Sequence, residues 1–348
     1  MVPRVVSSLF AGIYILLSWS FAQEEAGFVL SSRWFHPRHS QDKVSTVEAI
    51  EKFHPKRIDW TYTTDDKVLE LYRKRGIPYS LTMNPMVPDS AEYTTQKGRM
   101  RTLEQELYVA PWMRKWKIKT PYWGCVNNPD FQSTFLNRGK ELLRKGAYGI
   151  MVDDPDFNIR LKLDQGIGCF CHHCISDFLR FDSSFSDSED GIMTLAKKVL
   201  KANPEKTETY LLEFRKSYEA FQERAVIDFL ANWKQTLLKE FPKAKFLTNN
   251  YNGQWKEHHQ VFDGGIAELN EHLIEEKKLN ELYHTADSLG KTQLFGSNSQ
   301  QEKYHRILMK YGMEHKRDVL IPWDVYVKGS TNRFYIDYQK FEQLKHER

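Results

Sequence analysis

Short apolar runs alternate along this chain with longer segments in which apolar residues recur every three or four positions. The short runs are typical of buried β-strands, and the longer segments are typical of helices with one buried face. From Gly27 onward the alternation passes through eight apolar runs. We expect strands at residues 28–30, 57–62, 77–83, 148–152, 245–250, 261–269, 292–295 and 319–324.

This alternation of strands and helices predicts an α/β fold, specifically a (β/α)8 TIM barrel with parallel strands inside and helices outside. The clearest helical segment has apolar residues spaced by three or four from Leu211 to Leu237, and we expect it to lie along the barrel wall with one buried stripe. An open doubly wound sheet is the main alternative. It is disfavoured because no glycine-rich phosphate-binding sequence follows the first strand.

Two connections are much longer than a barrel requires, and they predict long insertions after strands 3 and 4. The first covers Val87–Asn128 and the second covers Pro155–Lys245. Loops of this length in compact domains usually carry function or are disordered. The first insertion is rich in aromatic rings, which either offer flat platforms to sugar rings or fill a second, smaller core. These rings belong to Trp112, Trp116, Tyr122 and Trp123.

The N-terminal segment has the pattern of a secretory signal peptide. Arg4 precedes an apolar core at Leu9–Leu17, and Ser20-Phe21-Ala22 supplies the small residues of a cleavage site. We therefore expect a signal peptide at residues 1–22, a single barrel domain at residues 23–348, and a secreted or periplasmic protein without stable membrane insertion. The alternative is an uncleaved helix that holds the protein at a membrane.

Composition agrees with one globular domain of barrel size. The 348 residues are 41% hydrophobic and 14% aromatic, which is enough for a sizeable core. The formal net charge of +4 is spread along the chain without a basic run, so the sequence does not favour nucleic acid as a partner.

The four cysteines predict a structural zinc site. Cys169, Cys171 and Cys174 form a C-x-C-x-x-C cluster, and Cys125 can serve as the fourth ligand of a tetrahedral ion. Disulfides are the alternative, because exported cysteines in even number usually pair. The short spacings strain any pairing within the cluster, which favours zinc.

The segment Gly168–Cys174, GCFCHHC, with Phe178–Phe181 and Cys125, resembles the zinc-cysteine region of family 42 β-galactosidases and of small uncharacterised glycoside-hydrolase-like barrels. The resemblance implies a (β/α)8 barrel, retaining hydrolysis by two carboxylates, and an acid/base group on strand four. This chain has Pro155 where the family has a glutamate at the end of that strand. It also has no room for the family's trimerisation and C-terminal domains.

Acidic residues follow three of the predicted strands, at the barrel end where catalytic groups gather. Asp153 and Asp154 end strand four, Glu268 ends strand six, and Asp324 ends strand eight. Neighbours on a strand face opposite sides, so only one of the paired aspartates faces the barrel lumen. We favour Asp154 as nucleophile or base because it is nearer the mouth. Glu268 is assigned as the acid, and Asp324 is the main substitute.

Polar and aromatic residues near the other strand ends predict a pocket suited to sugar hydroxyls and ring faces. As structural alternatives, Asp153 caps a loop and Glu271 starts the helix after strand six. The predicted substrate-binding residues are Trp34, His36, Tyr62, Asn84, Asp153, Asn250, Tyr251, Glu271 and Trp323.

The sequence therefore predicts an exported glycoside hydrolase that cleaves an oligosaccharide or polysaccharide by a two-carboxylate mechanism. A carbohydrate-binding barrel that has lost its acid/base is the second hypothesis, and Pro155 is the residue that favours it. A polysaccharide lyase is disfavoured because no grouping of a base with an arginine or metal is evident in the sequence.

Overall fold

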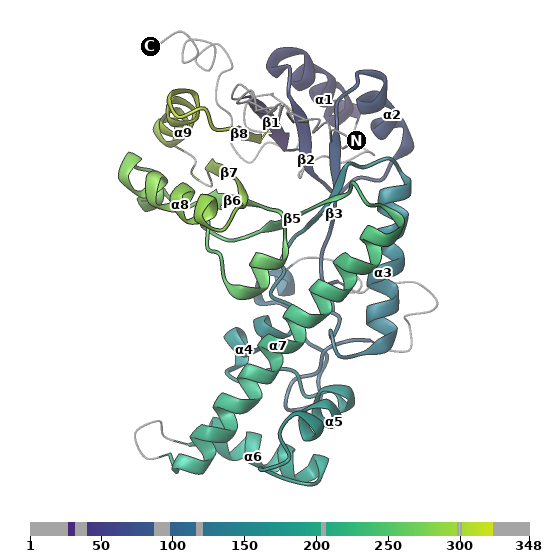
Figure 1. The fold of residues 1–348 in the computed structure, drawn as a ribbon, viewed down its shortest axis with the longest axis vertical. Helices are drawn as coiled ribbons and strands as arrows, with labels where there is room; N and C mark the ends of the chain where they lie inside the picture. The colour runs from purple at the N-terminus through teal and green to yellow at the C-terminus, as the bar shows by residue number, and fades with distance from the viewer. Residues whose placement is uncertain are drawn as a thin grey trace, which may run out of the picture.

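Eight parallel strands curve into a nearly closed barrel with helices on its outside (Figure 1). The structure is a computed structural model that describes residues 27–31, 40–86, 98–115, 121–202, 207–297, 299 and 301–322. The strands pair in the order β7-β6-β5-β4-β3-β2-β1-β8, and β7 lies in contact with β8 at the remaining seam. The predicted (β/α)8 barrel is confirmed.

The strands begin and end close to their predicted positions. The sixth differs most, because Glu257–Val261 form a short 3-10 helix and the strand starts only at Gly264. The strands are Phe28–Ser31 (β1), Arg57–Thr61 (β2), Tyr79–Met83 (β3), Gly149–Val152 (β4), Lys245–Asn249 (β5), Gly264–Leu269 (β6), Thr292–Ser297 (β7) and Val319–Pro322 (β8).

Side chains of short polar residues start several of the helices. Asp65 caps α2 by accepting a hydrogen bond of 2.9 Å from the backbone of Lys67, and Asn128 caps α3 in the same way. The helices are Ser40–Phe53 (α1), Asp66–Lys74 (α2), Pro129–Arg144 (α3), Asn158–Gln165 (α4), His172–Phe181 (α5), Glu189–Lys201 (α6), Thr209–Glu240 (α7), Glu276–Ser288 (α8) and Glu302–Glu314 (α9). Three 3-10 helices are Pro111–Lys115 (η2), Glu257–Val261 (η4) and Glu271–Leu273 (η5).

Seven of the eight strands each contribute a buried side chain to the barrel interior. These side chains form a continuous apolar layer, which makes the barrel a packed core. The buried members of this layer are Val29, Trp60, Met151, Leu247, Ile266, Leu294 and Leu320.

A polar network closes the barrel at the end where the strands begin. Asp59 is fully buried, and it accepts hydrogen bonds from Arg57 Nε at 2.8 Å and from the Tyr148 hydroxyl at 2.6 Å. Arg57 Nη1 also donates to Asp318 at 2.8 Å, next to the start of β8. The network therefore links β2 to the residues that lead into β4 and β8.

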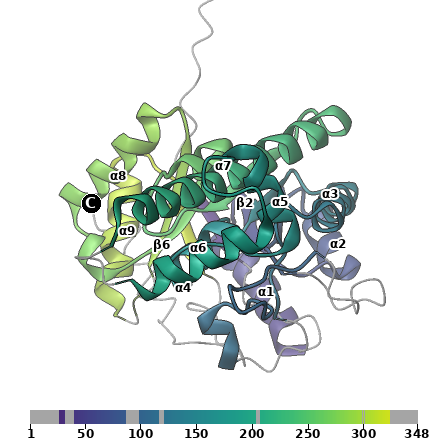
Figure 2. The same ribbon diagram turned by 90° about the horizontal axis from the view of Figure 1, so that it is seen from below.

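The second insertion forms a separate lobe below the barrel, built from α4, α5, α6 and the first half of α7 (Figure 1). Viewed from below, these helices lie in front of the barrel, with α8 and α9 on one side and α2 and α3 on the other (Figure 2). Phe178, Phe214, Tyr218 and Phe221 pack together in its core.

The first insertion contributes its aromatic rings to this lobe. Trp123 is buried in the lobe core, Trp112 packs against it and beneath the guanidinium of Arg160, and Arg99 lies over the ring of Tyr122. The satellite-core interpretation therefore holds for Trp123. Trp116 lies outside the described residues.

Helix α7 joins the two parts of the molecule. Its 32 residues confirm the predicted long helix. Phe229, Trp233 and Leu237 in its second half pack on the barrel and on α3, while the first half belongs to the lobe. Among the described helices, none is both long and apolar enough to span a membrane. The predicted signal peptide lies outside the described residues.

Candidate active site

Four polar side chains stand above the apolar interior at the mouth where the strands end. Each is two residues beyond an interior side chain. Alternation turns Asp153, Asn249 and Glu268 toward the lumen, whereas Tyr62 follows an irregularity in β2 and is placed there by its packing on the interior layer and its bond to Asp153. In order of interior residue and rim residue, the pairs are Trp60 and Tyr62, Met151 and Asp153, Leu247 and Asn249, and Ile266 and Glu268.

Asp153 is held from both sides of this mouth. Its Oδ2 atom accepts hydrogen bonds from the Tyr62 hydroxyl at 2.5 Å and from Trp60 Nε1 at 3.3 Å, both from the β2 side. Its Oδ1 atom accepts from Asn249 Nδ2 of β5 at 2.9 Å and from the backbone of Asp154 at 3.1 Å. Every partner is a donor, which matches the acceptor-only chemistry of a carboxylate.

Asp154 contacts the loop after β5. Its backbone has φ of 53°, in the left-handed region, and its Oδ1 atom accepts a 2.7 Å hydrogen bond from the Tyr251 hydroxyl. Burial and the neighbouring Asp153 raise the pKa of Asp154 to about 7, although the bond from Tyr251 acts in the opposite direction. Tyr251 also has positive φ, so the loops after β4 and β5 both hold strained backbone here.

The other predicted binding residues fall into different places. Asn84 interacts with the Tyr62 hydroxyl and accepts a 3.1 Å bond from the backbone of Met86. Asn250 is fully buried and exchanges two amide hydrogen bonds with Gln293, at 2.7 and 3.2 Å, so its amide is engaged inside the wall.

Glu271 lies in η5 and joins two loops. Its carboxylate accepts hydrogen bonds from the Ser299 hydroxyl and from Gln301 Nε2, which ties the loop after β6 to the loop after β7. Glu271 is the first residue of η5, so it does start the short 3-10 helix after β6, but it does not initiate α8, which starts at Glu276. Trp34, His36, Trp323 and Asp324 lie outside the described residues.

The structure brings the four cysteines together in the lobe. All are buried and free, and their sulfur atoms lie within 4.8 Å of one another. The Cys125 sulfur is 3.3 Å from that of Cys174 and 3.5 Å from that of Cys171. In a tetrahedral zinc site with Zn–S bonds of about 2.3 Å, sulfur atoms are about 3.8 Å apart. The cluster is therefore compatible with a metal site.

Amide donors surround these sulfur atoms. Asn158 Nδ2 lies 3.4 Å from the sulfur atoms of Cys125 and Cys174, and Asn127 Nδ2 lies 3.2 Å from Cys174. Burial raises the pKa of the Cys125 and Cys174 thiols, so a bound cation would be needed to draw off their protons. Asn158 begins α4, a few residues after Asp153, and thus links the cluster to the barrel mouth.

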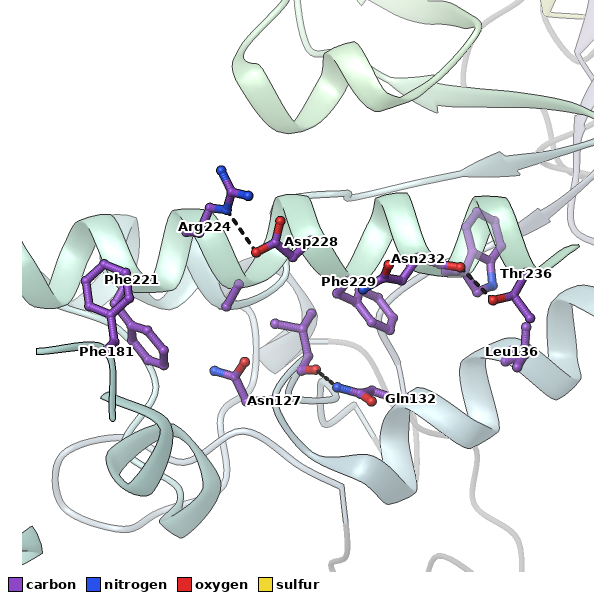
Figure 3. Close-up of a pocket in the computed structure, with 13 residues that line it drawn as sticks. Asn127, Gln132, Leu136, Phe181, Phe221, Arg224, Asp228, Phe229, Asn232 and Thr236 are labelled. Atoms are coloured by element: carbon purple, nitrogen blue, oxygen red, sulfur yellow. Dashed lines mark hydrogen bonds and ion pairs between the residues drawn. The ribbon is translucent and has the colours of Figure 1, made fainter. Parts of the chain in front are cut away.

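A groove lies between α3 and α7 on the outer wall of the barrel (Figure 3). Arg224 and Asp228 form a 2.9 Å ion pair along α7 at this groove, and Gln132 donates to the backbone of Val126 on the α3 side. The acidic side chain of this groove, Asp228, is paired with Arg224, and none of the strand-end carboxyl groups lines the groove. The barrel mouth therefore remains the candidate active site.

Several residues that shape the mouth were not predicted from the sequence. Trp60 and Asn249, which bind Asp153, are ordinary strand residues in the sequence and carry no signal of their own. Asp156 is buried and its Oδ1 atom lies 3.1 Å from Nε2 of His258, which is 102 residues away. Burial acts to raise the pKa of Asp156, but the interactions with His258, Lys256 and His259 together outweigh it and the pKa is lowered.

No family model and no curated protein matches this chain. Among solved structures, it is similar to a catalytic mutant of Gan42B, a GH42 β-galactosidase from G. stearothermophilus, with 11% identity and a TM-score of 0.59 over 94% of this chain and 56% of that one. It is also similar to α-L-fucosidase isoenzyme 2 from Paenibacillus thiaminolyticus, with 11% identity and a TM-score of 0.52 over 92% of this chain and 48% of the other. The chain thus spans about half the length of each, and the likeness shows a shared barrel fold.

Proposed function

We propose that this protein is a glycoside hydrolase that cleaves glycosidic bonds in an oligosaccharide or polysaccharide with two carboxyl groups at the barrel mouth. The observation that carries the proposal is the placement of Asp153, a lumen-facing carboxylate fixed by donors from β2 and β5. The shared fold with glycosidase barrels supports the same activity class.

Asp153 is assigned as the nucleophile or base, and Glu268 as the acid. Glycoside cleavage requires one ionised carboxylate that attacks the anomeric carbon or activates water, and one protonated carboxyl that assists the leaving oxygen. Asp153 follows the inward-facing Met151 on β4, and Glu268 follows the inward-facing Ile266 on β6. Strand β5 lies between β4 and β6, so the side chains of Asp153 and Glu268 face the same lumen.

This assignment exchanges the roles that the sequence alone favoured for the aspartate pair. Proximity to the mouth favoured Asp154 as the reactive group, but its side chain bonds to Tyr251 in the loop after β5. In the proposal Asp154 therefore braces the mouth. Asp324, which the sequence offers as a substitute acid, lies outside the described residues.

The proposal includes structural zinc on the four cysteines and export after removal of residues 1–22. Zinc would link the lobe, which contains α4, to the segment around Cys125. The side-chain amides of Asn158 and Asn127 would stabilise the thiolates by N–H···S bonds. The C-x-C-x-x-C spacing and the free state of the cysteines support the metal over disulfides.

The decisive experiment measures reducing-sugar release by the mature protein on a panel of glycans and on aryl glycosides of both anomeric series. On any substrate that is cleaved, Asp153→Asn and Glu268→Gln are each expected to lower kcat by about 10²–10⁴-fold. Asp154→Asn is expected to keep most of the turnover. The matched control is Asp187→Asn, an exposed acid in the lobe.

A different pattern of losses would reassign the residues. Loss in Asp154→Asn with turnover retained in Asp153→Asn would restore the assignment made from the sequence. A second candidate function, carbohydrate binding without cleavage, is favoured by the four donors that already occupy Asp153. It predicts glycan binding by calorimetry, with no reducing ends released from any glycan in the panel.

A further inference from the structure

A second cluster of metal-ligating side chains lies beside the candidate active site. Asp156, His258 and His259 are all buried, and each offers a ligand atom within 4.8 Å of the others. We propose that these three residues bind one divalent transition-metal ion, with Zn²⁺ as the first choice, at a site separate from the cysteine cluster. The proposal does not depend on the glycosidase activity.

The donor set suits such an ion. Two imidazole nitrogens and one carboxylate oxygen are ligands found together in zinc and other transition-metal sites. With bonds of about 2.0–2.1 Å, ligand atoms of a tetrahedral site lie about 3.3 Å apart. Asp156 Oδ1 and His258 Nε2 are already 3.1 Å apart. If the His259 ring moved slightly closer to Asp156 and His258, all three ligand atoms could bind the same ion.

His259 is the residue that a simple ion pair does not explain. Its side chain is 0% exposed, and within the described part of the chain neither ring nitrogen makes a hydrogen bond of good geometry, although the backbone of Gln254 lies close enough to interact with the ring. Burying an imidazole without such a bond costs free energy, so such a group in a native fold calls for a ligand. Its ring lies 4.1 Å from that of His258, centroid to centroid, and the ligand atoms of both lie within 4.8 Å of that of Asp156.

The surrounding charges leave room for a cation on one side of Asp156. Arg160 Nη1 lies 3.8 Å from Oδ2, whereas His258 faces Oδ1, so an ion at Oδ1 is separated from the guanidinium by the carboxylate. Lys256 is the other cation that acts on Asp156 and His259. The carboxyl group of Asp154 also interacts electrostatically with Asp156.

An ion at this place would join two loops of the barrel mouth. Asp156 belongs to the loop after β4, which also carries Asp153 and Asp154, while His258 and His259 belong to η4 after β5. Metal binding would therefore stabilise the loop pair that holds the candidate catalytic carboxylate, and we expect the apo protein to melt at a lower temperature than the loaded one.

The test uses the full chain without a histidine tag, stripped of metal under reducing conditions and titrated with Co²⁺. Thiolate-to-cobalt absorption reports the cysteine site alone, since the Asp156 site contains no sulfur. We expect Asp156→Asn and His259→Gln each to bind one ion fewer per chain than the wild type, with the thiolate absorption unchanged. His284→Gln, an exposed histidine on α8, is the matched control and should bind as the wild type does.

Two outcomes would overturn the proposal. One is a wild type in which all bound cobalt is accounted for by the thiolate absorption, which would leave Asp156 and His258 as a plain ion pair. The other is an unchanged ion count in both variants. If either variant fails to retain the circular dichroism spectrum of the wild type, His258→Gln replaces it, and the wild-type count still decides.

Discussion

The hydroxyl of Tyr62 donates a 2.5 Å hydrogen bond to Oδ2 of Asp153, and so joins the end of β2 to the end of β4 across the barrel mouth. Removing it in Tyr62→Phe frees one side of the carboxylate. We expect kcat to fall by about 10–100-fold because the carboxylate is misplaced. The free energy of unfolding should fall by about 1.5–3 kcal/mol, measured by urea titration.

Tyr148→Phe is the matched control for this prediction. The Tyr148 hydroxyl donates a 2.6 Å bond to Asp59, at the opposite end of the barrel. A similar loss of stability without the loss of kcat is expected. Equal loss of kcat in both variants would show that turnover follows general stability and not the position of Asp153.

The cysteine cluster gives a prediction about stability. In Cys125→Ser one sulfur ligand is lost, and we expect zinc to be lost with it, at a cost of about 4 kcal/mol or more in the free energy of unfolding. Metal analysis and thermal unfolding under reducing conditions check this. Ser217→Ala, which removes a 2.6 Å bond to Asp182 in the same lobe, should keep the zinc. Wild-type protein with oxidised cysteines and no zinc would contradict the prediction.

The aromatic core between α3, α7 and the barrel gives a prediction about packing. Phe135 is 2% exposed and contacts the rings of Phe157, Phe229 and Trp233. Phe135→Ala should lower the free energy of unfolding by about 3–5 kcal/mol because it leaves a cavity. Phe181→Ala removes a ring that is 51% exposed, and a loss of no more than about 1 kcal/mol is expected. Similar losses in the two variants would refute the cavity argument.

Gly149 allows β4 and β5 to approach closely. A Cβ atom at Gly149 would lie 2.3 Å from the backbone carbonyl oxygen of Lys245, which cannot move without separating the strands. We expect Gly149→Ala to cost about 2 kcal/mol or more in unfolding free energy. In Gly296→Ala the nearest atom is a Leu320 methyl at 3.1 Å, so a loss of less than about 1 kcal/mol is expected by the same measurement. A smaller loss at Gly149 would show that the strands can adjust.

The repeating pattern of apolar runs was enough to predict the barrel, because each run had to be buried and each helix had one apolar stripe. The same pattern could not decide how far α7 belonged to the wall. Its stripe from Phe214 to Leu237 is continuous in the sequence, yet the first half packs on Phe178 and the lobe. Periodicity shows that a face is buried but does not show against what.

The site was predictable only in part for a similar reason. Strand alternation required Asp153 and Asp154 to face opposite sides, but the phase depends on which neighbours fill the barrel, here Met151. The interaction of Asp156 with His258 joins residues 102 positions apart, so no local pattern could reveal it. Likewise, the burial of Asn250 against Gln293 depends on packing between strands.

Because one continuous helix, α7, belongs to both the barrel and the lobe, the lobe cannot be deleted by joining two loops. Removing the lobe would require cutting α7 within its 32 residues. The barrel would then lose the rings of Phe229 and Trp233, which pack against α3. Because the two hydrophobic clusters share this helix, loss of metal from the cysteines is expected to lower the stability of the barrel strands as well.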